Sequence, residues 1–93
     1  MPRVKRLVLD VLKPHQPNAL EFAKALAETG SELVVELQVV EVDERTESVM
    51  IEIRGEDLGY ERIERCVADL GASVHSIDGV EVQGDFAEPD TTD

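Results

Sequence analysis

The sequence is poor in aromatic and basic residues, and each shortage excludes a class of function. Aromatic residues make up 3% of the 93 positions, so the stacking platforms of single-strand nucleic-acid binders are absent. Nine lysines and arginines stand against 21 aspartates and glutamates, which gives a net charge of -12. This balance lacks the basic surface through which proteins bind nucleic acids or anionic lipid headgroups. We therefore expect no nucleic-acid partner and no membrane partner.

Cysteine and long apolar runs are also scarce. A single cysteine, Cys66, permits neither an internal disulfide nor a cysteine-based zinc site. The first apolar run is interrupted at Asp10, which is typical of neither a signal peptide nor a membrane span. At 10.3 kDa the chain has room for one core. We expect one cytoplasmic domain over residues 1–83, followed by an acidic, mobile tail over residues 84–93.

The first half of the chain predicts a strand followed by a helix. Residues 4–12 alternate in the period of a β-strand, with every second apolar side chain on one face. Asn18, followed three residues later by Glu21, resembles a capping box at a helix N-terminus. Apolar residues then recur at helical spacing over residues 19–29. Gly30 is placed to end this helix in the left-handed conformation.

The second half predicts a hairpin, a second helix and a last strand. Residues 32–42 are rich in β-branched side chains, and a phase slip at Val40 indicates a bulge. A polar connection of hairpin length precedes the alternating residues 49–54, so these two strands should pair antiparallel. An apolar helical stripe follows and ends at Gly71. Residues 72–82 complete the pattern as a fourth strand.

The resulting order, βαββαβ, predicts a ferredoxin-like α+β fold: a four-stranded antiparallel sheet with both helices on one face. The opposite face of the sheet would then be open to solvent. Its expected apolar residues are Val4, Val8, Leu12, Val34, Val40 and Met50. Scattered apolar residues on a surface are ordinary. A chain this small, however, gains core by pairing subunits, so we expect a homo-oligomer.

Two polar clusters are candidates for chemistry. His15 lies in the first loop, between two prolines, either as a ligand or metal contact or as a solvent-exposed histidine. His75, Ser76 and Asp78 lie on the last strand, where alternation separates His75 from the other two unless the strand carries a bulge. A histidine acting as general base would make the protein an enzyme. Because no catalytic motif accompanies either histidine, we expect a non-enzymatic protein.

The many carboxylates suit hard, oxygen-seeking cations such as calcium or magnesium. The sequence has no EF-hand spacing, so a cation site would have to be assembled from separated residues, across subunits where necessary. The candidate ligands are Asp10, Glu36, Glu41, Asp43 and Asp78. The ordinary alternative is that these residues solvate the surface.

Three segments carry a resemblance to a known family. They are residues 4–15 (VKRLVLDVLKPH), 39–47 (VVEVDERTE) and 74–78 (VHSID). Together they resemble the small archaeal family known as domain of unknown function 211. The resemblance implies a ferredoxin-like fold and ring-shaped homo-oligomers of about six or seven subunits, with no established activity. The positions it marks as a possible site are Asp10, Lys13, His15, His75, Ser76 and Asp78.

Two functions from different classes follow. The first is an oligomeric module that binds calcium or magnesium through carboxylates at subunit interfaces. The alternative is a small-molecule sensor resembling the ACT domains, which share the βαββαβ order and bind amino acids near the first strand-to-helix loop. Here Pro14 and Pro17 occupy that loop, where a glycine would let a ligand reach the backbone. Three lysines against 21 acidic residues also indicate adaptation to high salt.

Overall fold

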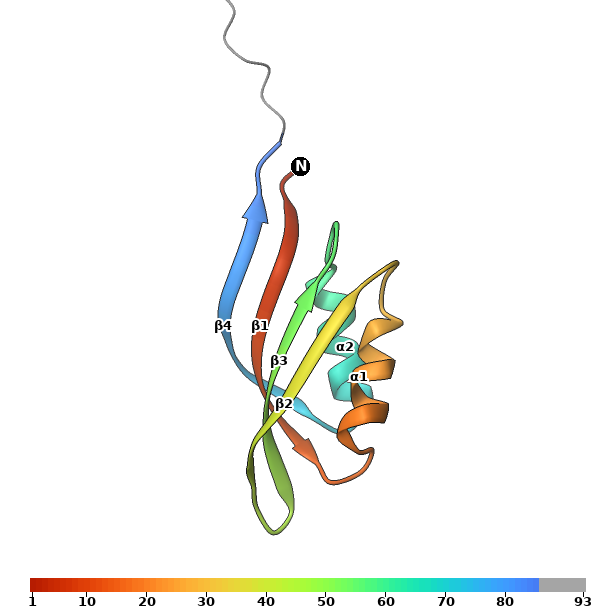
Figure 1. Ribbon diagram of the computed structural model, residues 1–93, viewed down its shortest axis with the longest axis vertical. Helices are drawn as coiled ribbons and strands as arrows, with labels where there is room; N and C mark the ends of the chain where they lie inside the picture. Colours follow the sequence, from red (N-terminus) through yellow and green to blue (C-terminus); the bar gives the residue numbers. More distant parts are fainter. Residues whose placement is uncertain (86–93) are drawn as a thin grey trace, which may run out of the picture.

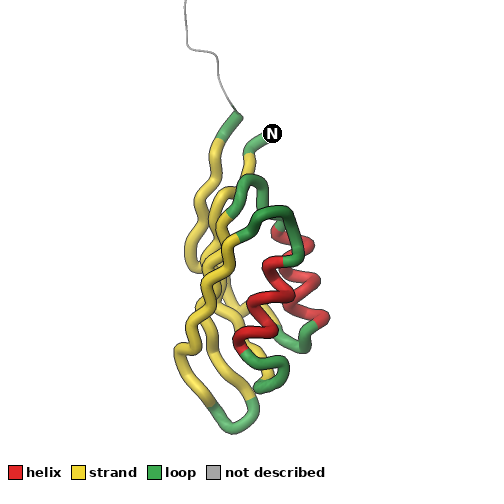
Figure 2. The backbone as a smooth tube through the Cα atoms, turned by 45° about the vertical axis from the view of Figure 1, so that its right-hand side comes forward, coloured by secondary structure: helices red, strands yellow, loops and turns green. Residues whose placement is uncertain are grey.

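The computed structural model describes residues 1–85 (Figure 1). Its elements are β1 (Arg3–Pro14), α1 (Ala19–Ala27), β2 (Val34–Val42), β3 (Thr46–Arg54), α2 (Tyr60–Asp69) and β4 (Ser73–Gln83). The strands form one sheet in the order β2-β3-β1-β4, with all neighbours antiparallel. Both helices lie on the same face of this sheet (Figure 2). The predicted ferredoxin-like fold is confirmed, and the predicted tail lies outside the described residues from position 86 onward.

The core forms between the two central strands and the helices. Six residues of β1 and β3 face one another across the strands and are buried, as the alternation predicted: the pairs are Leu7–Ile53, Leu9–Ile51 and Val11–Val49. Phe22 and Leu26 of α1 and Ile63 and Val67 of α2 cover them and are buried as well. Burying each such side chain contributes about 1.5–3 kcal/mol, so this layer supplies most of the stabilisation. None of the helices in residues 1–85 has the length and apolar character needed to cross a membrane.

The helix ends are partly as predicted. Asn18 caps α1, since its Oδ1 accepts a hydrogen bond of 2.9 Å from the backbone N–H of Glu21. Gly71, with φ of 83°, follows the end of α2 in the left-handed region. The predicted role of Gly30 is wrong, because α1 ends without a left-handed residue. The absence of a side chain at Gly30 leaves room for Leu33, since a Cβ at this position would lie 3.2 Å from the Leu33 side chain.

Bulges decide which residues reach the open face. The pairing of β2 with β3 shifts between Val39 and Glu41, which confirms the bulge predicted at Val40. In β1 the register with β4 shifts between Val4 and Arg6, and Val4 packs against the core. Its predicted place on the open face is therefore wrong. The other residues predicted there remain accessible: Val8 and Met50 are half-buried, and Leu12, Val34 and Val40 are exposed.

The two edge strands, β2 and β4, expose apolar side chains on the helix side of the sheet. Val39 of β2 and Ile77 and Val80 of β4 lie opposite buried residues of the central strands, so they point toward the helix layer. The helices do not extend over them, and their exposed fractions are 45%, 47% and 58%. Each edge therefore carries apolar side chains next to unpaired backbone groups.

We expect Phe22→Ala to lower the free energy of unfolding by about 3–5 kcal/mol, because it leaves a cavity beneath α1. Leu20→Ala on the exposed side of the same helix is the matched control and should change it by less than about 0.5 kcal/mol. Urea denaturation of the three proteins measures both. Equal losses for the two variants would contradict the assignment of the core.

Candidate functional site

A lysine is buried at the end of the core. Lys13 continues the buried phase of β1, two residues after Val11, and its side chain is fully shielded from solvent. Its Nζ donates to Glu47 Oε1 at 3.0 Å and to the carbonyl of Pro14 at 2.9 Å. It also lies 5.8 Å from the centroid of the Phe22 ring, within the range of a cation–π contact. The buried ammonium is thus paired, bonded and packed, as a buried charge must be.

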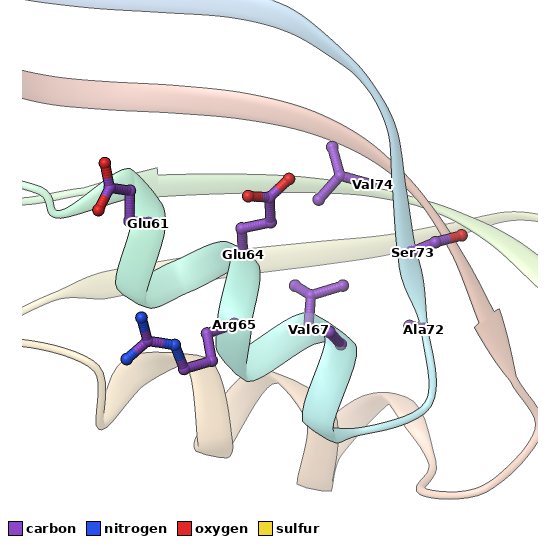
Figure 3. A pocket seen from close by; sticks show the side chains of 8 residues that line it. Glu61, Glu64, Arg65, Val67, Ala72, Ser73 and Val74 are labelled. Atoms are coloured by element: carbon purple, nitrogen blue, oxygen red, sulfur yellow. The ribbon is translucent and has the colours of Figure 1, made fainter.

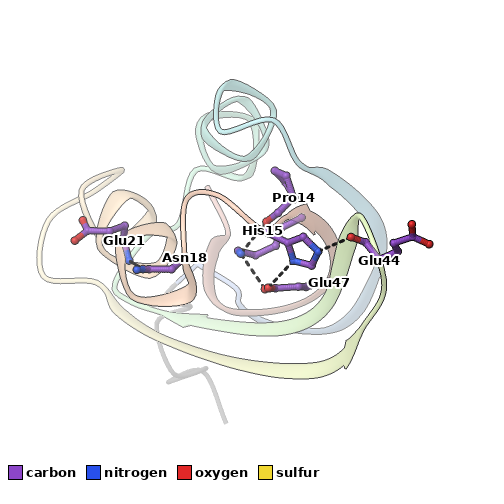
Figure 4. A network of polar contacts seen from close by, with 7 residues as sticks. Pro14, His15, Asn18, Glu21, Glu44 and Glu47 are labelled. Atoms are coloured by element: carbon purple, nitrogen blue, oxygen red, sulfur yellow. Dashed lines mark hydrogen bonds and ion pairs between the residues drawn. The ribbon is translucent and has the colours of Figure 1, made fainter.

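Glu47 links this lysine to a histidine. It lies directly opposite Lys13 in the pairing of β1 with β3. One carboxylate oxygen accepts from Lys13, and the other lies 3.0 Å from Nδ1 of His15 (Figure 4). The hydrogen bond to His15, followed by the one to Lys13, holds the pKa of this carboxyl below its usual range. Glu47 is therefore ionised and bound on both oxygens near neutral pH.

His15 is bound on both ring nitrogens. Besides the contact with Glu47, its Nε2 lies 3.0 Å from the backbone carbonyl of Glu44 (Figure 4). The bond to Glu47, and then the carbonyl of Glu44, raise the pKa of the imidazole. The expectation of a solvent-exposed loop histidine is too simple, since His15 joins the β1–α1 loop to the β2–β3 turn. It offers no free nitrogen to a metal or to a small molecule in that loop, because a ligating imidazole needs a lone pair.

The second predicted cluster lies at the β1–β4 boundary. Asp10 is directly opposite Ser76, and register shifts on either side of that pair leave His75 and Asp78 as extra residues of β4. Asp78 accepts a hydrogen bond of 2.6 Å from the Ser76 hydroxyl. His75 is exposed. The structure therefore brings three predicted residues together, Asp10, Ser76 and Asp78, while His75 is not hydrogen-bonded to them.

The other candidate cation ligands are separated. Glu36 and Glu41 lie on the edge strand β2, opposite Glu52 and Ser48 of β3, and Asp43 lies in the following turn. Across residues 1–85, histidine, cysteine, aspartate and glutamate nowhere gather in the groups of three or more that would hold a metal ion. Within the described residues, these carboxylates therefore do not form a cation site by themselves.

A groove between α2 and β4 was not predicted from the sequence. It has a volume of about 490 Å³, with Val67 and Val74 at its base and Glu61 and Glu64 along the helix side (Figure 3).

Glu47 was also missed as a site residue. The sequence did contain a signal for it. Lys13 falls in the buried phase of a strand, and a buried lysine requires an acidic partner.

Comparison with known proteins identifies a family for this chain. Residues 5–91 match the family DUF211, described as uncharacterized ArCR. The chain belongs to the DUF211 family. The DUF211 chain is also 38% identical over 80 residues to an uncharacterized protein, MJ0319, of Methanocaldococcus jannaschii, covering 86% of this chain and 82% of that relative. The predicted archaeal family is thus confirmed, and no activity comes with it.

Replacing the shared carboxylate tests the network of this DUF211 protein. We expect Glu47→Gln to lower the melting temperature by about 10 °C or more, because it leaves the buried Lys13 ammonium without a counter-charge. Glu44→Gln is the matched control, since Glu44 contributes only its backbone carbonyl to the hydrogen bond with His15. Differential scanning calorimetry measures both.

A double variant separates the charge from the packing. Lys13→Met with Glu47→Leu replaces the buried pair by apolar side chains, so it should be more stable than Glu47→Gln alone. A melting temperature for Glu47→Gln equal to that of Glu44→Gln would show that Lys13 does not depend on this carboxylate.

Proposed function

We propose that the protein is a non-enzymatic homo-oligomeric module whose copies join through the edge strands β2 and β4, with divalent cations bound by carboxylates at the junctions. The observation that carries the proposal is that both edges combine exposed apolar side chains with carboxylates. Edge strands are normally protected from pairing by charged side chains, above all lysine, by proline, by β-bulges or by a covering segment. Here both edges carry bulges and carboxylates. Neither β2 nor β4 contains a lysine, an arginine or a proline.

The topology supports head-to-tail joining. In the order β2-β3-β1-β4 with antiparallel neighbours, the two edge strands run in opposite directions. A second copy in the same orientation would therefore set its β2 antiparallel to the first copy's β4, with all helices on one side. Such heterologous contacts close into rings when the rotation between copies permits. Rings of about six or seven subunits are what the family resemblance implied.

The apolar side chains would be covered by this arrangement. Ile77 and Val80 of one copy would face the exposed side of Val39 and Val42 in the next, all of them β-branched residues suited to a sheet surface. Val42 is 62% exposed in the single chain. The junction would extend the sheet and continue the helix-side core between copies.

The junction would need counter-ions because carboxylates lie on both edge strands. Glu36 and Glu41 on β2 would approach Asp78 and Glu81 on β4, so like charges from two copies would meet. A calcium ion takes six to eight oxygen ligands, and no three acidic side chains gather within one chain in residues 1–85, so carboxylates from two copies would complete the set. Molar salt would also favour the junction, because at about 1 M the Debye length falls to roughly 3 Å and the repulsion between these carboxylates is screened.

The absence of enzymatic activity is part of the proposal. While His15 is protonated, the Lys13–Glu47–His15 network has its polar atoms bound to one another and to backbone carbonyls, so it presents no group free to take a substrate proton. Cys66 is half-buried, and burial raises the pKa of its thiol, which disfavours the nucleophilic thiolate.

Edge and face variants test which surface joins the copies. In 1 M potassium chloride we expect the wild-type protein at tens of micromolar to have a mass of about six or seven times 10.3 kDa by light scattering. In dilute buffer the average mass should be lower, because repulsion between the acidic copies is less screened. Val80→Lys should give the monomer, because it places a charge in the β4 edge.

Leu12→Lys is the matched control, since Leu12 is exposed on the open face of the central strand β1. It should retain the wild-type mass. Dissociation by Leu12→Lys and not by Val80→Lys would assign the interface to the open face, and a wild-type monomer at both salt concentrations would refute the proposal.

Cation dependence is tested separately. We expect calcium or magnesium chloride to raise the melting temperature of the oligomer, and Asp78→Asn to abolish this increase, because ligand binding to the folded assembly stabilises it. Glu61→Gln on α2 is the control and should keep the increase. The same melting temperature with and without either ion would remove cations from the proposal.

A further inference from the structure

His15 faces a hydrogen-bond acceptor at each of its two ring nitrogens. Its Nδ1 faces a carboxylate oxygen of Glu47 and its Nε2 faces the backbone carbonyl of Glu44, each at 3.0 Å. Both partners are acceptors, since Glu47 is ionised near neutral pH. A neutral imidazole has one N–H and can satisfy only one of them, whereas an imidazolium donates to both. The observed contacts therefore describe the protonated form of His15.

We propose that His15 is a pH switch that, when protonated, ties the β2–β3 turn to the β1–α1 loop and, when neutral, releases the turn. The turn itself is closed by a bond of 2.8 Å from the N–H of Asp43 to the carbonyl of Thr46. The bond from His15 to the carbonyl of Glu44 connects the tip of this turn to the β1–α1 loop, while Thr46 at its base is paired with Pro14 in the sheet. When the tip separates from the loop this bond remains as the turn's own closure, and it opens more often because His15 no longer holds the turn.

The geometry also decides which of the two bonds is lost. The groups that face His15 are Glu47 on β3, with Lys13 of β1 on its other oxygen, and the backbone of Glu44 and Asp43 in the turn. The one remaining proton of a neutral imidazole stays on Nδ1, because a bond to a carboxylate is stronger than one to a carbonyl. Nε2 and the carbonyl of Glu44 would then face each other as two acceptors, and this contact breaks.

The buried ion pair is insulated from this change. Lys13 binds Oε1 of Glu47 while His15 binds Oε2, so loss of the histidine proton leaves the lysine bond intact. Release of the turn is thus a local opening and not an unfolding of the core. Glu47 holds the core, and the pH-dependent bond is the separate one from Nε2 of His15 to the carbonyl of Glu44.

The direction of the pH dependence follows from the raised pKa of His15. A folded-state pKa above the ordinary value of about 6.5 means that the folded protein holds this proton more tightly than the unfolded chain does. The stabilisation is complete below about pH 6.5 and is lost as the pH rises through the folded-state value. The turn should therefore be held in mildly acidic solution and released in alkaline solution.

Nitrogen-15 and proton NMR of the intact protein tests the protonation state directly. We expect both ring nitrogens of His15 to carry protons at pH 6.5, and its titration midpoint to lie above that of the same histidine in the urea-unfolded chain. His15→Gln identifies the signals. A midpoint at or below the unfolded-chain value would overturn the switch, whatever the variant does to stability.

Hydrogen exchange tests the release of the turn. At pH 6 the amide of Asp43, which is bonded within the turn, should exchange about tenfold faster in His15→Gln than in the wild type, the factor that corresponds to one net hydrogen bond. At pH 9 the two proteins should exchange alike, since comparison at equal pH removes the intrinsic base catalysis. The control is His75→Gln on β4, which should match the wild type at both values. Equal protection of the wild type and His15→Gln at pH 6, or a difference that persists at pH 9, would overturn the proposal.

Discussion

The ion pair between Lys13 and Glu47 is the interaction on which the arrangement around the β2–β3 turn depends. A buried ammonium without a counter-charge costs several kcal/mol, so Lys13 occupies the buried phase of β1 only because Glu47 stands opposite it. This requirement defines the register of β3 against β1. A slip of one residue would turn Glu47 to the open face and would move Val49, Ile51 and Ile53 out of the core at the same time. The polar pair and the apolar alternation therefore specify the same register.

The second carboxylate oxygen of Glu47 connects the buried ion pair to His15 at the surface. Through His15 it connects the loop that precedes α1 with the turn that follows β2, two segments about 30 residues apart in the chain. The ring of Phe22 lies over the same ammonium from the helix side, so the helix layer, the central strands and the turn all contact one charged cluster. A change at any one of these groups alters the electrostatic surroundings of the others, which is why their substitutions should not be additive.

The sequence predicted what depends on local periodicity and failed where long-range pairing decides. The buried faces of β1 and β3 and the bulge at Val40 follow from alternation alone. Glu47 was assigned to a polar connection, and only the pairing of β3 from Thr46 onward shows that it faces Lys13. The register shifts of β4 likewise depend on its partner strand, so the hydrogen bond between Ser76 and Asp78 could not be derived from their spacing. A residue's neighbour across a sheet is a property of two segments, which one-dimensional patterns do not contain.

The charge of the chain has a different consequence at the edges than on the rest of the surface. Lysine is one of the common devices against edge pairing, and its positive charge repels a second copy and cannot be neutralised by a simple cation. Here the charged residues of the edge strands are carboxylates, Glu36 and Glu41 on one side and Asp78 and Glu81 on the other. Carboxylates also repel a second copy, but a divalent cation or molar salt converts that repulsion into shared coordination or screens it. Protection of this kind depends on the solvent, so under the proposed assembly the same residues would keep copies apart in dilute buffer and help to join them when cations are abundant.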